Sequence, residues 1–194
     1  MLEDYIQIVT NPKEFFRDNT PSFNKSAIFA TLMIGLASII EIIFGLIAGR
    51  DLLLEDALTG FLAGGLLLIV YPIVSIIFGL LLMTIMSGLT HLFVKLLGGS
   101  DFKKTFSVFS HALILTPVSA LASLLPISYL GSFLALVVYL YYLFILVEGV
   151  KVVHKFSTVK AALAVGLSYL VIILAAAAFL LMLILGFAAM VSTA

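Results

Sequence analysis

The sequence predicts an all-α, polytopic membrane protein with five transmembrane helices. Of its 194 residues, 63% are hydrophobic and only 10% are charged, and the mean hydropathy is +1.31. Soluble domains carry about a quarter charged residues, so a water-soluble globular fold is excluded. Long apolar runs bounded by polar turns divide the chain into helices, because roughly 20 apolar residues are needed to cross a bilayer core of about 30 Å.

Residues 1–25 are predicted to form an amphipathic, interfacial segment ahead of a transmembrane domain over residues 26–194. Its first apolar residues recur at i, i+3, i+4 and i+7, the spacing of one helix face: Leu2, Tyr5, Ile6 and Val9. Asn11 is expected to cap a second short helix that starts with a proline and contains Phe15 and Phe16. The apolar faces either lie on the membrane surface or pack on the ends of the spans.

The first span is predicted from Ala27 to Gly49, a run interrupted only by Glu41. The next apolar run, from Phe61 to Gly98, is long enough to raise the question of two spans. We interpret it as one long helix kinked at Pro72. Its breaks contain no polar turn, and a division would leave a first half too short to cross.

Three further spans follow, with short connections. Ser100 and Asp101 are expected to cap a helix from about 102 to 125, and the turn after it leads directly into a fourth helix from about 132 to 155. The fifth and most uniformly apolar helix is predicted from about 159 to 190.

The basic residues predict the orientation, because short cytoplasmic loops are enriched in Lys and Arg. Arg50 alone lies on one side of the predicted membrane, and the other nine basic residues share the opposite side: Lys13, Arg17, Lys25, Lys95, Lys103, Lys104, Lys151, Lys155 and Lys160. The N-terminus is therefore expected in the cytoplasm and the C-terminus outside. Dividing the run from 61 to 98 into two spans would destroy this asymmetry.

Three ionisable residues form a predicted intramembrane polar cluster. His91, His111 and Glu148 all lie roughly 9 to 14 Å below the cytoplasmic surface at 1.5 Å per residue, and burying such groups costs about 2.5 to 3.5 kcal/mol each. They either converge in a polar cavity, as a proton relay or a divalent-metal site of two histidines and one carboxylate, or form interhelical hydrogen bonds that fix packing. Lys151, three residues after Glu148, could also neutralise it.

Glu41 is an isolated buried acid in the first span, without an evident charge partner in the sequence. It is either a protonated hydrogen-bond donor inside the bundle or part of a transport path.

Several function classes are disfavoured. The net charge is zero, so the chain has no basic surplus for nucleic acid, and it contains no cysteine for a disulfide, a zinc-thiolate site or a thiol nucleophile. The sequence lacks the usual hydrolase, metalloprotease and phosphate-binding motifs. We therefore expect no enzyme and, apart from the metal alternative above, no cofactor.

Several short segments together resemble the prokaryotic branch of the Ypt-interacting-protein (Yip) domain family: residues 11–16, the Gly98-Gly99-Ser100 turn with residues 102–106, Pro117, residues 148–154 and residues 157–161. The resemblance covers nearly the whole chain. It implies an integral membrane protein whose eukaryotic relatives act in vesicle traffic and bind prenylated Rab GTPases, and it implies no catalytic residue.

We therefore expect a multi-pass protein of a prokaryotic cell membrane that acts as a binding or organising module, in membrane trafficking or membrane organisation. Its working surface would be the cytoplasmic face of residues 1–25, 95–104 and 151–160, represented by Phe15, Phe16, Lys103, Lys104, Lys151 and Lys155. The expected partners are membrane lipids and a protein bound at this face, and the small-residue faces permit a homodimer without requiring one. The alternative is a small transporter, channel or lipid-handling protein that uses the polar cavity.

Overall fold

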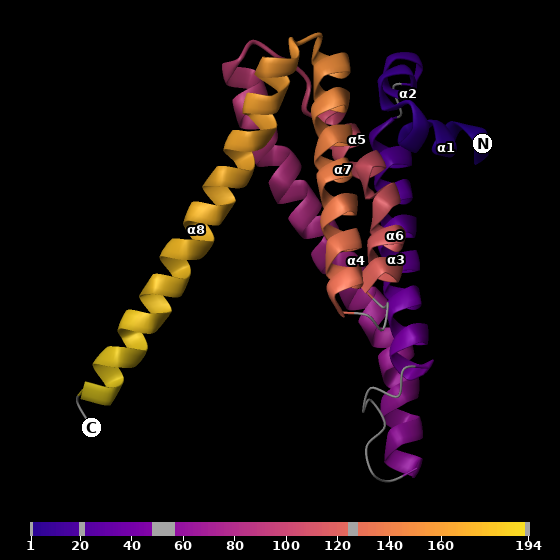
Figure 1. The fold of residues 1–194 in the computed structure, drawn as a ribbon, viewed down its shortest axis with the longest axis vertical. Coiled ribbons are helices and arrows are strands. Elements are labelled where there is room, and N and C mark those ends of the chain that lie inside the picture. Colours follow the sequence, from indigo (N-terminus) through magenta and orange to yellow (C-terminus); the bar gives the residue numbers. More distant parts are fainter. Residues whose placement is uncertain (1, 20–21, 48–56, 124–127, 193–194) are drawn as a thin grey trace.

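The computed structural model describes residues 2–19, 22–47, 57–123 and 128–192, arranged as in Figure 1. Every element within these ranges is a helix. The elements in chain order are α1 (Leu2–Thr10), α2 (Pro12–Asp18), α3 (Phe23–Ile47), α4 (Ala57–Leu96), α5 (Phe102–Ala112), the 3-10 helix η1 (Leu113–Leu115), α6 (Thr116–Ser123), α7 (Ser128–His154) and α8 (Thr158–Ser192).

Five helical segments among the described residues are long and apolar enough to cross a membrane: Phe23–Phe44, Leu68–Leu96, Phe102–Ala122, Tyr129–His154 and Thr158–Leu185. For the described residues, the predicted all-α fold with five helices able to span a membrane is therefore confirmed. The prediction that the run from 61 to 98 is one helix is also confirmed, because α4 passes through Pro72 without interruption. Membrane helices tolerate an internal proline where neighbouring groups satisfy the freed carbonyl.

The third span is divided where a continuous helix was predicted. Pro117 has no N–H to donate to the carbonyl of Leu113, and the N–H of Thr116 donates to that carbonyl instead. This tighter pattern produces η1 between α5 and α6. The divided span is also the most enclosed of the five. In its most apolar 18-residue stretch, 67% is buried, against 33% or less in each of the other spans.

The spans form a bundle that opens at one side (Figure 1). α3 packs on α4, α5 and α6, while α7 packs on α5, α6 and α8. α4 runs obliquely toward the end of the bundle at which α8 begins, and α8 then diverges from the other helices toward its C-terminus. The buried core includes Phe109, Ile145 and Leu146, so it lies around α5 and α7.

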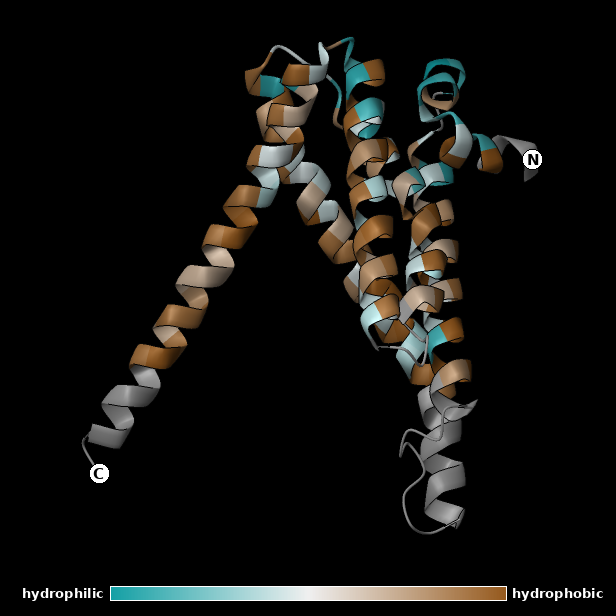
Figure 2. Ribbon diagram, viewed as in Figure 1, coloured by the Kyte–Doolittle hydropathy of each residue, from teal (hydrophilic) through white to brown (hydrophobic). Residues whose placement is uncertain are grey.

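Only the first turns of α8 are packed against the bundle. Ala161, Ala164, Val165 and Ser168 are buried, and the hydroxyl of Thr90 on α4 donates a 2.8 Å hydrogen bond to that of Ser168. Beyond this contact, α8 is exposed on all sides over residues 171–185 and is almost wholly apolar (Figure 2). In a bilayer this surface faces lipid.

The N-terminal helices pack on the bundle. Asn11 caps α2 as predicted, its side chain accepting from the N–H of Glu14 at 3.4 Å. Phe15 and Phe16 are only 3% and 2% exposed, and the hydroxyl of Tyr141 on α7 donates to the carbonyl of Val9. The apolar face of α2 therefore packs against the spans, which is one of the two alternatives for this segment.

Candidate functional site at the lysine-rich end

Hydrophilic residues gather at one end of the molecule, where α2, the turn between α4 and α5 and the turn between α7 and α8 are found (Figure 2). We call this the lysine-rich end, because nine basic residues lie on or beside these three elements: Lys13, Arg17, Lys25, Lys95, Lys103, Lys104, Lys151, Lys155 and Lys160. Arg50 lies outside the described residues. The grouping that the sequence predicted for these nine residues is therefore present in the fold.

The two turns at this end contact each other. Gly98 adopts a φ of +93° and Asp101 a φ of 72°, and the Asp101 carboxylate caps α5 by accepting from the N–H of Lys103 at 3.0 Å. A Cβ on Gly99 would lie 2.9 Å from the ring of Phe156 in the other turn. The close approach therefore requires glycine at this position and fixes the two turns relative to each other.

A hydrogen-bonded chain of three side chains joins α4, α5 and α7 just below the turns. The Thr105 hydroxyl lies 3.1 Å from His91 Nδ1 and 3.0 Å from His154 Nε2. Thr105 is fully buried, so its one hydroxyl proton can be donated to only one of the two imidazoles, and the other ring must donate its own N–H to the Thr105 oxygen.

His111 is separate from this chain. Its Nδ1 donates to the carbonyl of Ser107 at 2.7 Å, and its ring stacks on Phe29 with the centroids 4.9 Å apart. Phe15 and Phe16 of α2 pack against the same ring, at centroid distances of 5.4 and 6.4 Å. His111 is 4% exposed, and in this aromatic surrounding it serves packing between α2, α3 and α5.

Glu148 is also engaged elsewhere. Both of its carboxylate oxygens accept from Lys151 Nζ, at 2.8 and 3.2 Å. This is the local i to i+3 neutralisation that the sequence permitted.

The predicted three-residue cluster therefore does not form one site. His91, His111 and Glu148 each have different partners, and no group of three metal-ligating residues is found among the side chains that the structure describes. Equal distance from the span ends does not bring residues together, because the tilt and the rotation of each helix decide which side chains meet.

Glu41 has a partner that the sequence did not reveal. The hydroxyl of Tyr71 on α4 donates to the Glu41 carboxylate at 2.6 Å. Glu41 is half-buried and Tyr71 is 40% exposed. The pair ties α3 to α4 far from the lysine-rich end, and Glu41 accepts in this bond, whereas one of the sequence-based alternatives made it a donor.

The residues of the predicted working surface divide into two kinds. Lys103 and Lys155 are exposed, and Lys104 and Lys151 are half-buried at the edge of the same end. Phe15 and Phe16 are buried beneath it, so they support the surface and do not present it.

Thr105 and His154 are the residues that sequence reasoning missed. His154 is the last residue of α7 and Thr105 lies in the first turns of α5, so both are at the same membrane level as the end of α4. The predicted span ends place these residues at one level. The equal predicted depth of His91 and His111, however, pointed to His111 as the partner of His91.

Comparison with known families gives a match to the family model described as Yip1 domain, over residues 6–181. The matched range contains α2 and four complete spans, and it ends four residues before the described end of the fifth span. Comparison with curated proteins and with solved structures finds no match.

Proposed function

The chain belongs to the Yip1 domain family, and from this premise we propose that it is a binding or organising module whose working surface is the lysine-rich end. It has five helices able to span a membrane. In this proposal the lysine-rich end faces the cytoplasm of a prokaryotic cell, the N-terminus is cytoplasmic, the C-terminus is outside, and the protein acts in membrane trafficking or membrane organisation. The proposal requires no enzymatic activity, cofactor, nucleic acid or homodimer.

The observation that carries the proposal is the concentration of solvent-facing charge on a rigidly supported end. Within the described residues, Arg17 pairs with Asp18 at 2.8 Å and Lys151 with Glu148. The hydrogen bond from Arg17 lowers the pKa of Asp18, so this pair is ionised at neutral pH. In the described part of the chain, Lys103 and Lys155 form no ion pair. Lys155 lies in the turn between α7 and α8, and Lys103 lies directly after the turn between α4 and α5. The contact of Gly99 with Phe156 holds these two turns together.

In-membrane photo-cross-linking tests this proposal. Probes at Lys13, Lys103 and Lys155 occupy exposed positions at the lysine-rich end, and a probe at Tyr129, which is 89% exposed at the start of α7, is the matched control at the opposite end. We expect a discrete protein partner at the first three positions, absent at Tyr129, and we expect its capture by the Lys13 probe to be lost when Lys103→Glu and Lys155→Glu are introduced together. Capture of lipid alone at all four positions would contradict the binding-module proposal.

A second candidate function, transport or conduction through the bundle, is favoured by the His91–Thr105–His154 chain. Two imidazoles linked through one hydroxyl across three helices can pass a proton between them. Proteoliposome flux tests this candidate: it predicts flux that is lost in Thr105→Val and kept in Thr84→Val, which removes a hydroxyl bonded only to its own helix. Equal flux in both variants would exclude the chain as a path.

A further inference from the structure

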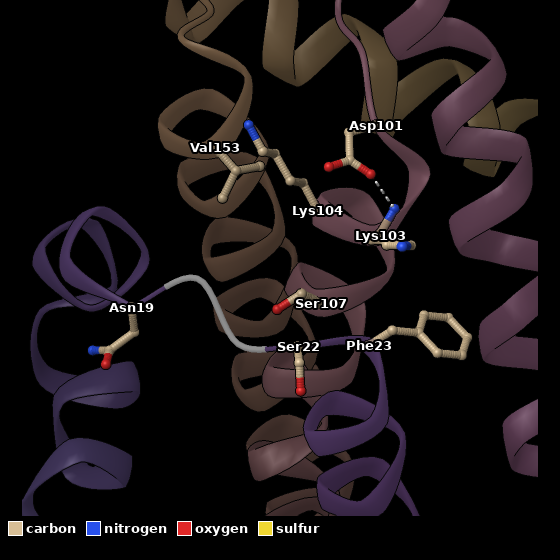
Figure 3. A pocket seen from close by; sticks show the side chains of 8 residues that line it. All are labelled: Asn19, Ser22, Phe23, Asp101, Lys103, Lys104, Ser107 and Val153. Carbon is tan, nitrogen blue, oxygen red and sulfur yellow. Dashed lines mark hydrogen bonds between the residues drawn. The ribbon is translucent and has the colours of Figure 1, made fainter.

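A pocket of about 450 Å³, lined by both polar and apolar side chains, opens beside the first turn of α5, between α5, the end of α7 and the start of α3 (Figure 3). Lys103, Lys104 and Asp101 lie on its α5 side, and Asn19 and Ser22 lie on the side that leads into α3. Its volume falls within the range of about 300 to 1,000 Å³ that is typical of small-molecule sites. The pocket is separate from the His91–Thr105–His154 chain, none of whose residues lines it.

The depth of the pocket matches that of lipid headgroups. Three apolar segments end at its rim: Phe23 starts the first candidate span, Phe102 starts the third, and Val153 precedes the last residue of the fourth. Phe23 and Val153 themselves line the pocket. It therefore has an apolar side where hydrocarbon begins and a polar side toward water.

The charges of the pocket favour an anion. Lys103 and Lys104 supply two ammonium groups, whereas the single carboxylate, Asp101, is held by the backbone N–H of Lys103. Asp101 also accepts the N–H of Lys104 through its carbonyl, at 3.2 Å, so the N–H groups of Lys103 and Lys104 are both occupied. The lysine side chains therefore supply the charge for a ligand here.

Neutral polar groups complete the lining. Asn19, Ser22 and Ser107 all have hydrogen-bonding side chains at the pocket. Ser26 lies one helical turn beyond Ser22 on the same face of α3. It is fully buried, and its hydroxyl has no hydrogen-bond partner among the described residues.

We propose that this pocket binds the phosphate of an anionic phospholipid headgroup. Lys103 and Lys104 contact the phosphate, the neutral polar side chains bind the remaining headgroup oxygens, and the acyl chains leave past Phe23 and Val153 into the bilayer. The chemistry recognised is a phosphate ester, and membrane depth together with the apolar rim favours a lipid over a soluble phosphate. The proposal does not depend on which partner or process the lysine-rich end serves.

The test uses the full chain in nanodiscs of phosphatidylcholine that contain a photoactivatable phosphatidylglycerol. We expect cross-links to concentrate on peptides that contain residues 19–23 and 101–107, and to fall by about tenfold in Lys103→Gln with Lys104→Gln. Lys95→Gln with Lys160→Gln removes the same charge from exposed positions of the same end that do not line the pocket, and it should leave the cross-links unchanged. An equal loss in both double variants would overturn the proposal, because it would show a diffuse charge effect.

A second pair of variants tests the pocket without changing its charge. Ser22→Trp should fill the pocket and lower the cross-links, whereas Asn24→Trp changes an exposed neighbour that does not line it and should not. Unchanged cross-linking in Ser22→Trp would overturn the proposal.

Competition distinguishes the two sources of phosphate. Millimolar inorganic phosphate, at ionic strength matched with chloride, should leave the lipid cross-links in place. Displacement by phosphate and not by chloride would overturn the lipid assignment in favour of a soluble ligand.

Discussion

Thr105 supplies one hydroxyl to two imidazole rings on different helices. Its proton can be donated to only one ring, so the other ring must present its own N–H to the Thr105 oxygen. The hydrogen-bonded link between α4, α5 and α7 therefore passes through one oxygen atom.

We predict that Thr105→Val lowers the free energy of unfolding by about 1 to 3 kcal/mol, because it leaves two ring nitrogens without their partner. Thr105→Ser keeps the hydroxyl and should retain most of that stability. Thr84→Val is the control, since Thr84 bonds only to the carbonyl of Leu80 in its own helix. Denaturant unfolding in detergent measures all three, and equal stability of Thr105→Val and Thr84→Val would contradict the account.

Only some of the contacts between individual side chains could be predicted from the sequence. Periodicity gave the depth of His91 and His111, but it could not give the rotation of one helix against another, so it joined His91 to the wrong histidine. The pairing of Glu148 with Lys151 was accessible because it is local, at i to i+3. The bond from Tyr71 to Glu41 was not, because it joins residues 30 positions apart.

Among the helices, α2 is held by its two aromatic residues. Phe16 lies against α7 at Gly149, where a Cβ would come within 2.9 Å of its ring and 2.5 Å of Val108. Phe15 packs beside it against His111. The absence of a side chain at Gly149 therefore lets α2, α5 and α7 meet.

We expect Phe16→Ala to release α1 and α2, since truncating a buried aromatic residue costs about 3 to 5 kcal/mol. Trypsin cleavage at the exposed Lys13 and Arg17 should rise by more than about tenfold, because it follows the open population. Ile6→Ala, on the half-exposed side of α1, is the control. Unchanged cleavage in Phe16→Ala would mean that the segment is held by something other than this contact.

The close packing at Gly149 leaves no room for a side chain. Gly149→Ala should cost about 1 to 3 kcal/mol through overpacking against Val108 and Phe16. Gly166→Ala in α8, where a Cβ meets nothing within 4 Å, should be neutral or slightly stabilising. Thermal unfolding compares the two, and a Gly149→Ala protein as stable as Gly166→Ala would refute the close approach.

Most of the helices were predictable because apolar run length and caps decide them. The five spans, the uninterrupted α4 and the Asn11 and Asp101 caps follow from local sequence. The division of the third span follows from Pro117 acting on the carbonyl of Leu113, yet a proline such as Pro72 lies in α4 without such a break. Only the neighbouring helices decide between the two outcomes.

The molecule as a whole is asymmetric along its length. Among the described residues, the basic side chains are concentrated at the lysine-rich end, and α8 exposes apolar side chains on every side over residues 171–185. This division predicts a fixed orientation in the membrane, since lysines on short loops are retained on the cytoplasmic side. The binding-module function proposed above for the lysine-rich end requires that orientation.

Labelling of single cysteines tests the orientation most directly, because the chain contains no cysteine of its own. Lys103→Cys and Lys155→Cys report the lysine-rich end, and Tyr129→Cys reports the opposite end. In intact cells, a membrane-impermeant maleimide should label Tyr129→Cys and reach the other two only after the membrane is permeabilised. Labelling of Lys103→Cys and Lys155→Cys in intact cells, with Tyr129→Cys protected, would place the lysine-rich end outside and contradict its role as a cytoplasmic binding surface.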